Sequence, residues 1–422
     1  MNSKRAQKNN ELSDICNYAL HRSELGIIMG FMKTVVVGMS GGVDSSVAAY
    51  LLKEQGYNVV GVTMQIWQEE DACSIEANGG CCGLSAVEDA RRVADELGIP
   101  FYVMNFRDEF RHHVIDYFID EYFRGRTPNP CIACNRYVKW ESLLKRSLSI
   151  GADYIATGHY ARIEKLENGR YAICRSATLE KDQTYALYNL SQEQLAKTLM
   201  PCGDYSKEEI REMAGRIDLP IANKPDSQDI CFVPDGDYAS FIEREITERE
   251  SIPNDMFTEE GKSKRDDENS LESESIKKNE YKKKSGPGNF ITKQGDVVGE
   301  HKGIVHYTVG QRKGLGLSMG HPVFVLEIRP ETNEVVIGTY EESLVDTLVA
   351  DQINFMSIPD LTKPGRALAK IRYNHPGAWC IVEKTGADEI TCRFEEPQRA
   401  VTPGQAVVLY DGNVVLGGGT IR

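Results

Sequence analysis

The chain has 422 residues, of which 41% are hydrophobic and 27% are charged, and its formal net charge is −14. This length and composition predict a globular protein of two or three domains with a large core. No run of eighteen apolar residues occurs, and residues 1–31 lack the apolar centre of a signal peptide, so no membrane association is expected. Eleven cysteines, an odd number, indicate a reducing, cytoplasmic location rather than a disulfide framework.

Residues 33–162 alternate between short β-branched runs and segments with helical apolar spacing. Strands are expected at KTVVVGMS, NVVGVTMQIW, PFYVMNF and ADYIATGHYAR. Helices are expected at SSVAAYLLKEQG, SAVEDARRVADELG, residues 107–123 and NRYVKWESLLKRSL. This alternation predicts an α/β, Rossmann-like parallel sheet covered by helices, with ligands at the carboxyl ends of the strands.

The composition changes after about residue 220. Residues 251–285 are highly charged and hold few large apolar side chains, which predicts a flexible insertion. Beyond it, PVFVLEIRPETNEVVIG, ALAKIRYN, AWCIVEK, EITCRFEE and QAVVLYDGNVVLGGGTI are short runs separated by turn residues, typical of a small antiparallel β-barrel or sandwich. The expected parts are an extension (1–31), a catalytic domain (32–220), a central domain with the insertion (221–310) and a C-terminal β-barrel (311–422).

The motif VVVGMSGGVDSS, residues 35–46, follows a predicted strand and opens a predicted helix. Glycine backbone amides and serine hydroxyls at the positive end of a helix can surround a phosphate group. The motif lacks the Gly-Lys-Ser/Thr of a Walker A loop and the glycine spacing of a dinucleotide fingerprint. The alternative is an ordinary glycine-rich turn.

A second motif, TPNPCIACN, holds Cys131 and Cys134 three positions apart. The pair could be a disulfide, half of a metal site, or a nucleophile with a neighbour. Cys134 precedes a predicted helix whose dipole would lower its pKa, and Arg136 is close in sequence. A metal site is also conceivable in ACSIEANGGCCGL, although vicinal cysteines lack the usual zinc spacing; its cysteines are Cys73, Cys81 and Cys82.

The glycine-rich motif resembles the PP-loop of ATP pyrophosphatases, which cleave ATP between its α and β phosphates and adenylate an oxygen of the substrate. Seven further segments, TPNPCIACNRYVKW, ATGHYAR, KDQTYAL, DSQDICFV, GNF, GEHKGIVHYTVGQRKGLG and KIRYNHP, follow in the order found in the MnmA (TrmU) family of tRNA-specific 2-thiouridylases. The resemblance covers residues 32–250 and 286–422.

The resemblance implies a sulfurtransferase that uses ATP and Mg²⁺ to replace the C2 oxygen of the wobble uridine by sulfur. It implies tRNAs for glutamate, glutamine and lysine as substrates, and a cysteine desulfurase or sulfur-relay protein as the partner. ATP would be bound by Gly38, Met39, Ser40, Gly41, Gly42, Val43, Asp44, Ser45, Met64 and Gly158. The tRNA would be contacted by Asn129, Pro130, Cys131, His159, Lys181, Asp182, Gln183, Arg372, Tyr373 and Gln405.

Two of these residues have an alternative interpretation. Asp44, just inside a predicted helix, would assist Mg²⁺ and phosphate placement, but it could instead be a helix cap. His159 could be a histidine that is merely satisfied at the end of a strand.

The resemblance also implies catalytic roles for cysteines: Cys134 is the nucleophile and Cys231 carries the persulfide. Much of the family has aspartate where this chain has Cys131, and a thiol is a poorer acid or base at neutral pH than a tuned carboxyl group. A second scheme therefore stays open, in which Cys131, Cys134 and Cys231 ligate three irons of a 4Fe-4S cluster.

The net charge of −14 is unusual for an RNA-binding protein, since phosphate contacts need lysine and arginine. Local basic groups would have to supply them: Arg124, Arg126, Arg136, Lys139, Arg312, Lys313, Lys370 and Arg372. Two other functions remain possible from the residues, namely a PP-loop enzyme with a different acceptor and a nucleotide-gated redox or metal-sensing module.

Overall fold

The computed structural model describes residues 32–66, 84–219, 221–222, 224, 230–233, 235–251, 281 and 284–422. The expectations for residues 1–31, for Cys73, Cys81 and Cys82, and for most of the charged insertion lie outside these ranges. Within them, no helix combines the length and apolar character needed to cross a membrane.

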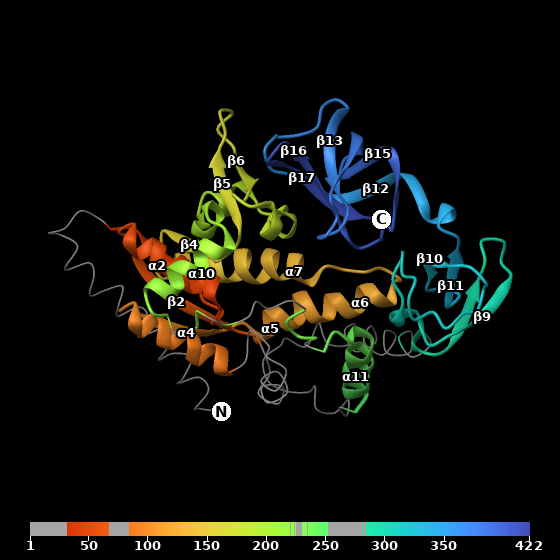
Figure 1. Ribbon diagram of the computed structural model, residues 1–422, viewed down its shortest axis with the longest axis horizontal. Helices are drawn as coiled ribbons and strands as arrows, with labels where there is room; N and C mark the ends of the chain where they lie inside the picture. Colours follow the sequence, from red (N-terminus) through yellow and green to blue (C-terminus); the bar gives the residue numbers. More distant parts are fainter. Residues whose placement is uncertain are drawn as a thin grey trace, which may run out of the picture.

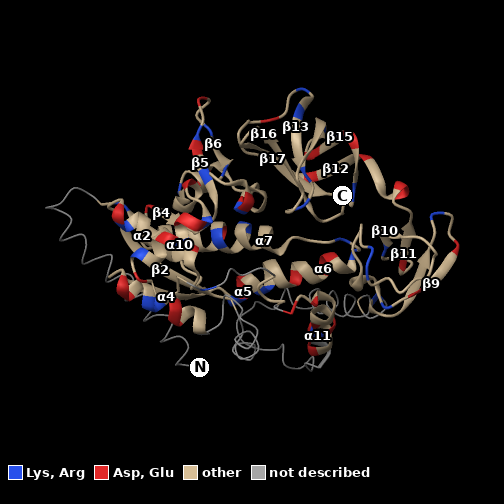
Figure 2. Cartoon of the chain, in the orientation of Figure 1, with Lys and Arg blue, Asp and Glu red and all other residues tan. Residues whose placement is uncertain are grey.

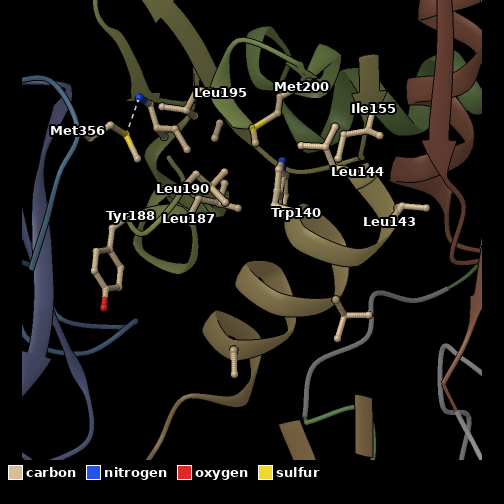
Figure 3. Close-up of a cluster of buried hydrophobic side chains, with 14 of the residues drawn as sticks. Trp140, Leu143, Leu144, Ile155, Leu187, Tyr188, Leu190, Leu195, Met200 and Met356 are labelled. Carbon is tan, nitrogen blue, oxygen red and sulfur yellow. Dashed lines mark hydrogen bonds between the residues drawn. The ribbon is translucent and has the colours of Figure 1, made fainter. Parts of the chain in front are cut away.

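The N-terminal part is built on a five-stranded parallel sheet in the order β3-β2-β1-β4-β7 (Figure 1). Its strands are β1 Thr34–Gly38, β2 Asn58–Gln65, β3 Phe101–Asn105, β4 Tyr154–Ala156 and β7 Thr198–Leu199. Val35 and Val37 pack with α2 Val43–Glu54, α4 Leu84–Glu96 and α10 Lys207–Arg216. Val36 points to the other face, where Trp140 and Leu143 lie in a second core cluster (Figure 3). Both faces of β1 are therefore buried, which explains its unbroken apolar run.

Two long helical spans lie side by side and connect the parallel sheet with the rest of the molecule (Figure 1). The first comprises α5 Arg107–Phe110, η1 Arg111–Asp116 and α6 Tyr117–Phe123, which confirms the helix expected over residues 107–123. The second comprises α7 Pro130–Ala133, η2 Cys134–Leu143 and α8 Leu144–Ser149. The short helices are η3 Leu179–Lys181, η4 Thr184–Leu187, α9 Gln192–Leu195, η5 Pro201–Asp204, η7 Ile304–His306 and η8 Glu341–Ser343.

The strand expected over ADYIATGHYAR is in fact two strands. Only β4, Tyr154–Ala156, stays in the parallel sheet. The chain then leaves the sheet at residues 157–160, and β5 Ala161–Lys165 forms a hairpin with β6 Tyr171–Arg175. The expectation of a single strand was wrong. The alternation of apolar and polar residues continues through residues 157–160, but tertiary packing at Gly158 bends the chain there.

The C-terminal part is a closed antiparallel barrel, as predicted. Its strands run in the order β12-β15-β14-β13-β16-β17, and pairing of β12 with β17 closes it. The strands are β12 Leu344–Phe355, β13 Gly365–Lys370, β14 Ala378–Gly386, β15 Glu389–Arg399, β16 Ala406–Asp411 and β17 Val414–Ile421. The β5–β6 hairpin is attached to this barrel through β17.

A separate four-stranded sheet has the order β10-β11-β8-β9. Its strands are β8 Gly288–Ile291, β9 Val297–His301, β10 Phe324–Arg329 and β11 Glu334–Gly338. The run PVFVLEIRPETNEVVIG was expected in the C-terminal barrel because of its alternating apolar pattern. It belongs instead to this separate sheet, because β11 pairs with β8.

Helix α11, Tyr238–Ser251, packs beneath α6, and Tyr281 joins the same apolar cluster (Figure 1). The ring centroids of Tyr281 and Phe123 are 4.3 Å apart. Tyr281 and Lys284 are buried although both fall within residues 251–285, where a flexible insertion was expected.

Candidate active site

The phosphate loop, residues 38–45, connects β1 to α2. Ser40 donates its backbone N–H to Oγ of Ser45 at 3.2 Å, and that hydroxyl donates to the carbonyl of Gly42 at 3.2 Å. Gly42 is the N-cap of α2 and has no side chain to cap the helix. No N-cap side chain therefore accepts from the backbone N–H groups at the positive end of the helix, which faces the loop. Gly41 has φ +68°, and a Cβ there would lie 2.3 Å from the carbonyl oxygen of Ala86. Glycine is therefore required at position 41.

Asp44, in the first turn of α2, does not cap the helix. Its Oδ1 accepts hydrogen bonds from Nζ of Lys207 and from the hydroxyl of Tyr160, each at 2.7 Å. The Lys207 side chain is 9% exposed, whereas that of Asp44 is 33% exposed. The structure thus places a buried cation against the aspartate of a loop that has no Walker lysine.

The bend after β4 brings Gly158 onto the phosphate loop. A Cβ on Gly158 would lie 2.6 Å from the backbone carbon of Asp44 and 2.6 Å from the backbone nitrogen of Ser45. The loop and the strand end therefore fit together only because residue 158 lacks a side chain. Met64 lies at the end of the neighbouring strand β2, and the preceding Thr63 donates its hydroxyl to the Met39 carbonyl at 2.7 Å.

His159 is half-buried beside the same bend. Its Nδ1 is 2.7 Å from the hydroxyl of Thr157, and its ring centroid is 5.6 Å from that of Trp140. Burial, with a smaller contribution from the Lys139 ammonium, holds the pKa of His159 well below its usual value. The imidazole is therefore neutral at pH 7.

Cys131 and Cys134 lie on the second helical span. Asn129 is the N-cap of α7, and its side chain accepts from the backbone N–H of Cys131 at 3.1 Å and of Ile132 at 3.3 Å. Cys131 is exposed and Cys134 is half-buried. The expectation that Cys134 precedes the helix was wrong, because Pro130 starts the helix and Asn129 caps it. Cys134 sits one turn inside, where the helix dipole has less effect, and Cys131 lies closer to the positive end.

Cys231 is half-buried and, like Cys134, packs against the apolar cluster that contains Trp140 and Leu143. The two cysteines, almost a hundred residues apart in sequence, thus border the same core. Among the described residues, which include Cys131, Cys134 and Cys231, no three His, Cys, Asp or Glu side chains are grouped closely enough to hold a metal ion. Nothing in the described part of the chain supports the cluster scheme.

Comparison with known proteins identifies the family. Three family models match: "tRNA methyl transferase HUP domain" over residues 33–235, "tRNA methyl transferase PRC-barrel domain" over residues 278–339 and "Aminomethyltransferase beta-barrel domain" over residues 345–421. The chain is 61% identical over 390 residues to the tRNA-specific 2-thiouridylase MnmA of Lachnoclostridium phytofermentans, an alignment that spans 92% of this chain and 99% of that protein. The chain belongs to the tRNA-specific 2-thiouridylase family.

Two other members of this family are also similar along almost their whole length. The MnmA proteins of Clostridioides difficile and Clostridium perfringens are 51% and 53% identical, each over 92% of this chain and 98% of the relative. A solved complex of a 4-thiouridine synthetase with RNA and bound ATP is 19% identical, covers 51% of each chain and has a TM-score of 0.27, which is too low to carry an argument. The family resemblance inferred from the motifs is confirmed.

Several of the residues that 2-thiouridylase motifs mark for tRNA lie where the helical spans meet the barrel. Gln405 donates from Nε2 to the carbonyl of Thr127 at 2.8 Å and to that of Pro128 at 3.3 Å. It thereby fixes the segment that leads into Asn129 and Cys131. Tyr373 is 40% exposed, and its pKa is raised by burial and by the nearby Asp182 and Cys131.

The other residues expected to contact tRNA differ in the hydrogen bonds that they already make within the protein. Gln183 accepts the backbone N–H of Tyr160 at 2.9 Å, so it also supports the bend beside the phosphate loop. Arg372 is half-buried and donates to the carbonyl of Arg399 at 3.3 Å; burial, with a smaller contribution from Arg399, lowers its pKa. Lys181 is half-buried at the end of η3.

Acidic and basic residues are interspersed over the described elements (Figure 2). Arg124 and Arg126, two of the basic residues expected to serve RNA, both pair with Glu121, at 3.0 and 2.7 Å. Their charges are therefore partly neutralised within the protein.

Sequence reasoning missed two lysines at the phosphate loop. Lys207 pairs with Asp44 from 163 positions away. Lys224 donates to the carbonyl of Gly41 at 3.1 Å and to Asp89 at 2.8 Å, and it opens the segment that leads to Cys231. Neither lysine lies in a recognisable spacing, so only an alignment or a structure could have found them.

A cavity of about 50 Å³ lies between the cysteine helix and the barrel, bordered by Asn129, Arg136, Tyr188 and Gly404 among others. It has room for little more than water, whereas sites for drug-sized ligands occupy roughly 300–1,000 Å³. A cavity of this size does not accommodate a nucleobase.

Proposed function

We propose that this protein catalyses the ATP-dependent 2-thiolation of the wobble uridine of tRNA. The observation that carries the proposal is the 61% identity to a tRNA-specific 2-thiouridylase across 99% of that relative. The site supports it chemically, because β1, which leads into the phosphate loop, shares a core with the cysteine-bearing helix through Val36. A PP-loop enzyme with another acceptor, or a sensor module, would not require this full-length match.

ATP would bind along the phosphate loop, Met64 and Gly158, and would adenylate the C2 oxygen of uridine with release of pyrophosphate. Mg²⁺ would be held by the 33%-exposed carboxylate of Asp44 together with ATP phosphates, and would supply neutralisation of phosphate charge. Lys207, which holds Asp44 in this structure, would stay at hand as a second cation once the phosphates enter.

Cysteine chemistry would complete the exchange. The terminal sulfur of a persulfide on Cys231 attacks adenylated C2, and AMP leaves. The Cys134 thiolate then attacks Sγ of Cys231, which breaks the S–S bond, releases the sulfur on the uridine as the thiocarbonyl and leaves a Cys134–Cys231 disulfide. A thiol reductant must reduce that disulfide, and a cysteine desulfurase or sulfur-relay protein must reload Cys231, before the next turnover.

The finer assignments belong to the same proposal. The residues named above at the barrel junction, with His159, Lys181, Asp182 and Gln183, would contact tRNA, and the substrates would be tRNAs for glutamate, glutamine and lysine. The described cysteines Cys174, Cys202, Cys380 and Cys392 are buried thiols, which supports a reducing, cytoplasmic location.

Mass spectrometry after one turnover of persulfide-loaded enzyme tests the sulfur route. We expect a tryptic peptide pair joined through Cys134 and Cys231 in the parent enzyme and no pair in Cys134→Ser. Cys131→Ser is the matched control three residues away, and it should still form the pair. If all three cysteines are needed and only iron-loaded enzyme thiolates, without any such disulfide, the cluster scheme replaces the persulfide scheme.

A further inference from the structure

The sulfur route proposed above uses Cys134 and Cys231, and it leaves the neighbouring Cys131 without a part in sulfur transfer. Cys131 lies one helical turn before Cys134, whose backbone N–H donates to the carbonyls of Cys131 and Pro130. Helical geometry places Cα atoms three residues apart at about 5 Å, within the range of roughly 4.4–6.8 Å that disulfides span. The two thiols can therefore form a disulfide within one turn of the helix, as in other Cys-x-x-Cys motifs.

The three cysteines differ in exposure. Cys131 is exposed, whereas Cys134 and Cys231 are half-buried and pack against the apolar cluster that contains Trp140 and Leu143. A disulfide between Cys134 and Cys231 would thus form against this core. Because thiol–disulfide exchange requires access to the attacked sulfur, a reductant of protein size would reach Cys131 more readily than that disulfide.

Hydrogen bonds on both sides fix the turn that carries Cys131. Asn129, the N-cap of α7, accepts the backbone N–H of Cys131 at 3.1 Å. From the barrel, Gln405 donates to the carbonyl of Thr127 at 2.8 Å. These contacts use main-chain groups of the turn and not the Cys131 thiol, so Cys131 would keep its place beside Cys134 when Cys134 is oxidised.

We propose that Cys131 is a third working thiol, which removes the oxidation from Cys231 after each turnover. The Cys131 thiolate, its proton released to water, attacks Sγ of Cys134 in the Cys134–Cys231 disulfide. The Cys131–Cys134 bond forms, the Cys134–Cys231 bond breaks, and Cys231 leaves as a thiolate that can be reloaded with sulfur. No electrons enter or leave the protein in this step. The inference rests on the proposed function, since that function creates the Cys134–Cys231 disulfide.

The oxidation then leaves the protein through the exposed cysteine. One thiolate of an external dithiol attacks Sγ of Cys131, and Cys134 leaves as a thiolate. The second thiol of the reductant then releases Cys131, and the reductant becomes a disulfide that has supplied both electrons. This is the thiol reductant that the proposed function already requires. Both enzyme disulfides are transient, as is usual for catalytic disulfides in a reducing compartment.

A time course of one turnover tests the exchange directly. Persulfide-loaded enzyme receives ATP and a tRNA transcript without reductant, and samples are quenched with acid, alkylated and digested with trypsin. Cys131 and Cys134 share the tryptic peptide of residues 127–136, so their disulfide lowers the mass of that peptide by two hydrogens and blocks its alkylation. In the parent, the peptide pair joined through Cys134 and Cys231 should appear first and then give way to this form. In Cys131→Ser the pair should persist.

A second turnover separates this role from a role in substrate binding. After the first turnover, the enzyme is treated with a protein dithiol of the thioredoxin type, separated from it, reloaded by a cysteine desulfurase and given fresh ATP and tRNA. Cys131→Ser should match the parent in the first turnover and lose the second. Treatment with a small phosphine, which can reach a half-buried disulfide, should restore the second turnover. Cys174→Ala, which removes a buried thiol of β6, is the matched control and should behave like the parent in both turnovers.

A full second turnover of Cys131→Ser after the protein dithiol would overturn the proposed role of Cys131 and leave the proposed function intact. A first turnover that already fails in Cys131→Ser would also overturn it, because Cys131 would then act in binding or in the chemistry itself. A parent enzyme that forms no Cys134–Cys231 disulfide contradicts the proposed sulfur route instead, and the exchange with it.

Discussion

Replacing Gly158 by alanine should disable the phosphate loop with little effect elsewhere. The added Cβ would lie 2.6 Å from two backbone atoms of the loop, and ordinary contacts begin at 3.4 Å, so one side must move by up to 3.4 − 2.6 = 0.8 Å. Both partners are main chain and cannot swing aside. Overpacking of this kind costs about 1–3 kcal/mol of stability. Misplacement of a catalytic loop on the order of 1 Å can cost about 10²-fold in rate.

The assay is tRNA-dependent release of pyrophosphate with varied ATP. We expect kcat/KM for ATP to fall about 10²-fold in Gly158→Ala, while tRNA affinity stays near that of the parent. Gly215→Ala is the matched control, because a Cβ on Gly215, inside α10, meets no atom within 4 Å. It should keep full activity and gain roughly 0.5–1 kcal/mol from helix propensity. Activity of Gly158→Ala within threefold of the parent at unchanged thermal stability would refute the close-fit argument.

Further predictions concern the Asp44–Lys207 pair, the half-buried His159 and the charged insertion. Asp44→Asn should abolish pyrophosphate release and lower stability by about 1–3 kcal/mol, because Lys207 loses a charged acceptor; adding Lys207→Met should restore stability, measured by urea unfolding, but not activity. The pKa of His159 is lower in the folded state than its unfolded value near 6.5, so the unfolded state binds more protons between these two values. His159 therefore lowers the free energy of unfolding as the pH decreases below about 6.5, by at most about 1.4 kcal/mol per pH unit. His159→Gln should flatten the pH dependence of unfolding, and an unchanged slope would contradict the assignment. Deleting residues 255–278, which spares the buried Tyr281, should leave thiolation within a few-fold of the parent and should not lower Tm.

The parallel sheet and the barrel could be predicted because their signals are local. Buried parallel strands read as continuous apolar runs, and the turn at Gly56, with φ +83°, ends α2 where the helical spacing stops. The phosphate loop was recognisable for the same reason, since all its residues are consecutive.

The errors occur where distant parts of the chain decide the local structure. The strand pattern continues through Gly158, but packing on Asp44 and Ser45 bends the chain there. The predicted start of the cysteine helix was too late, because Asn129 followed by Pro130 is a helix-start signal, with asparagine as the N-cap and proline at the first helical position. Lys207 reaches Asp44, and Gln405 reaches Thr127, across 163 and 278 positions, and no spacing rule encodes such pairs.

The central claim is that ATP cleavage and sulfur insertion are coupled on one tRNA uridine. The most direct test incubates purified persulfide-loaded protein with ATP and an unmodified tRNA transcript, and quantifies nucleosides by mass spectrometry and nucleotides by chromatography. The account predicts 2-thiouridine at the wobble position, with AMP and pyrophosphate formed in equal amounts to it. Formation of ADP and inorganic phosphate, or consumption of ATP without sulfur in the tRNA, would contradict it.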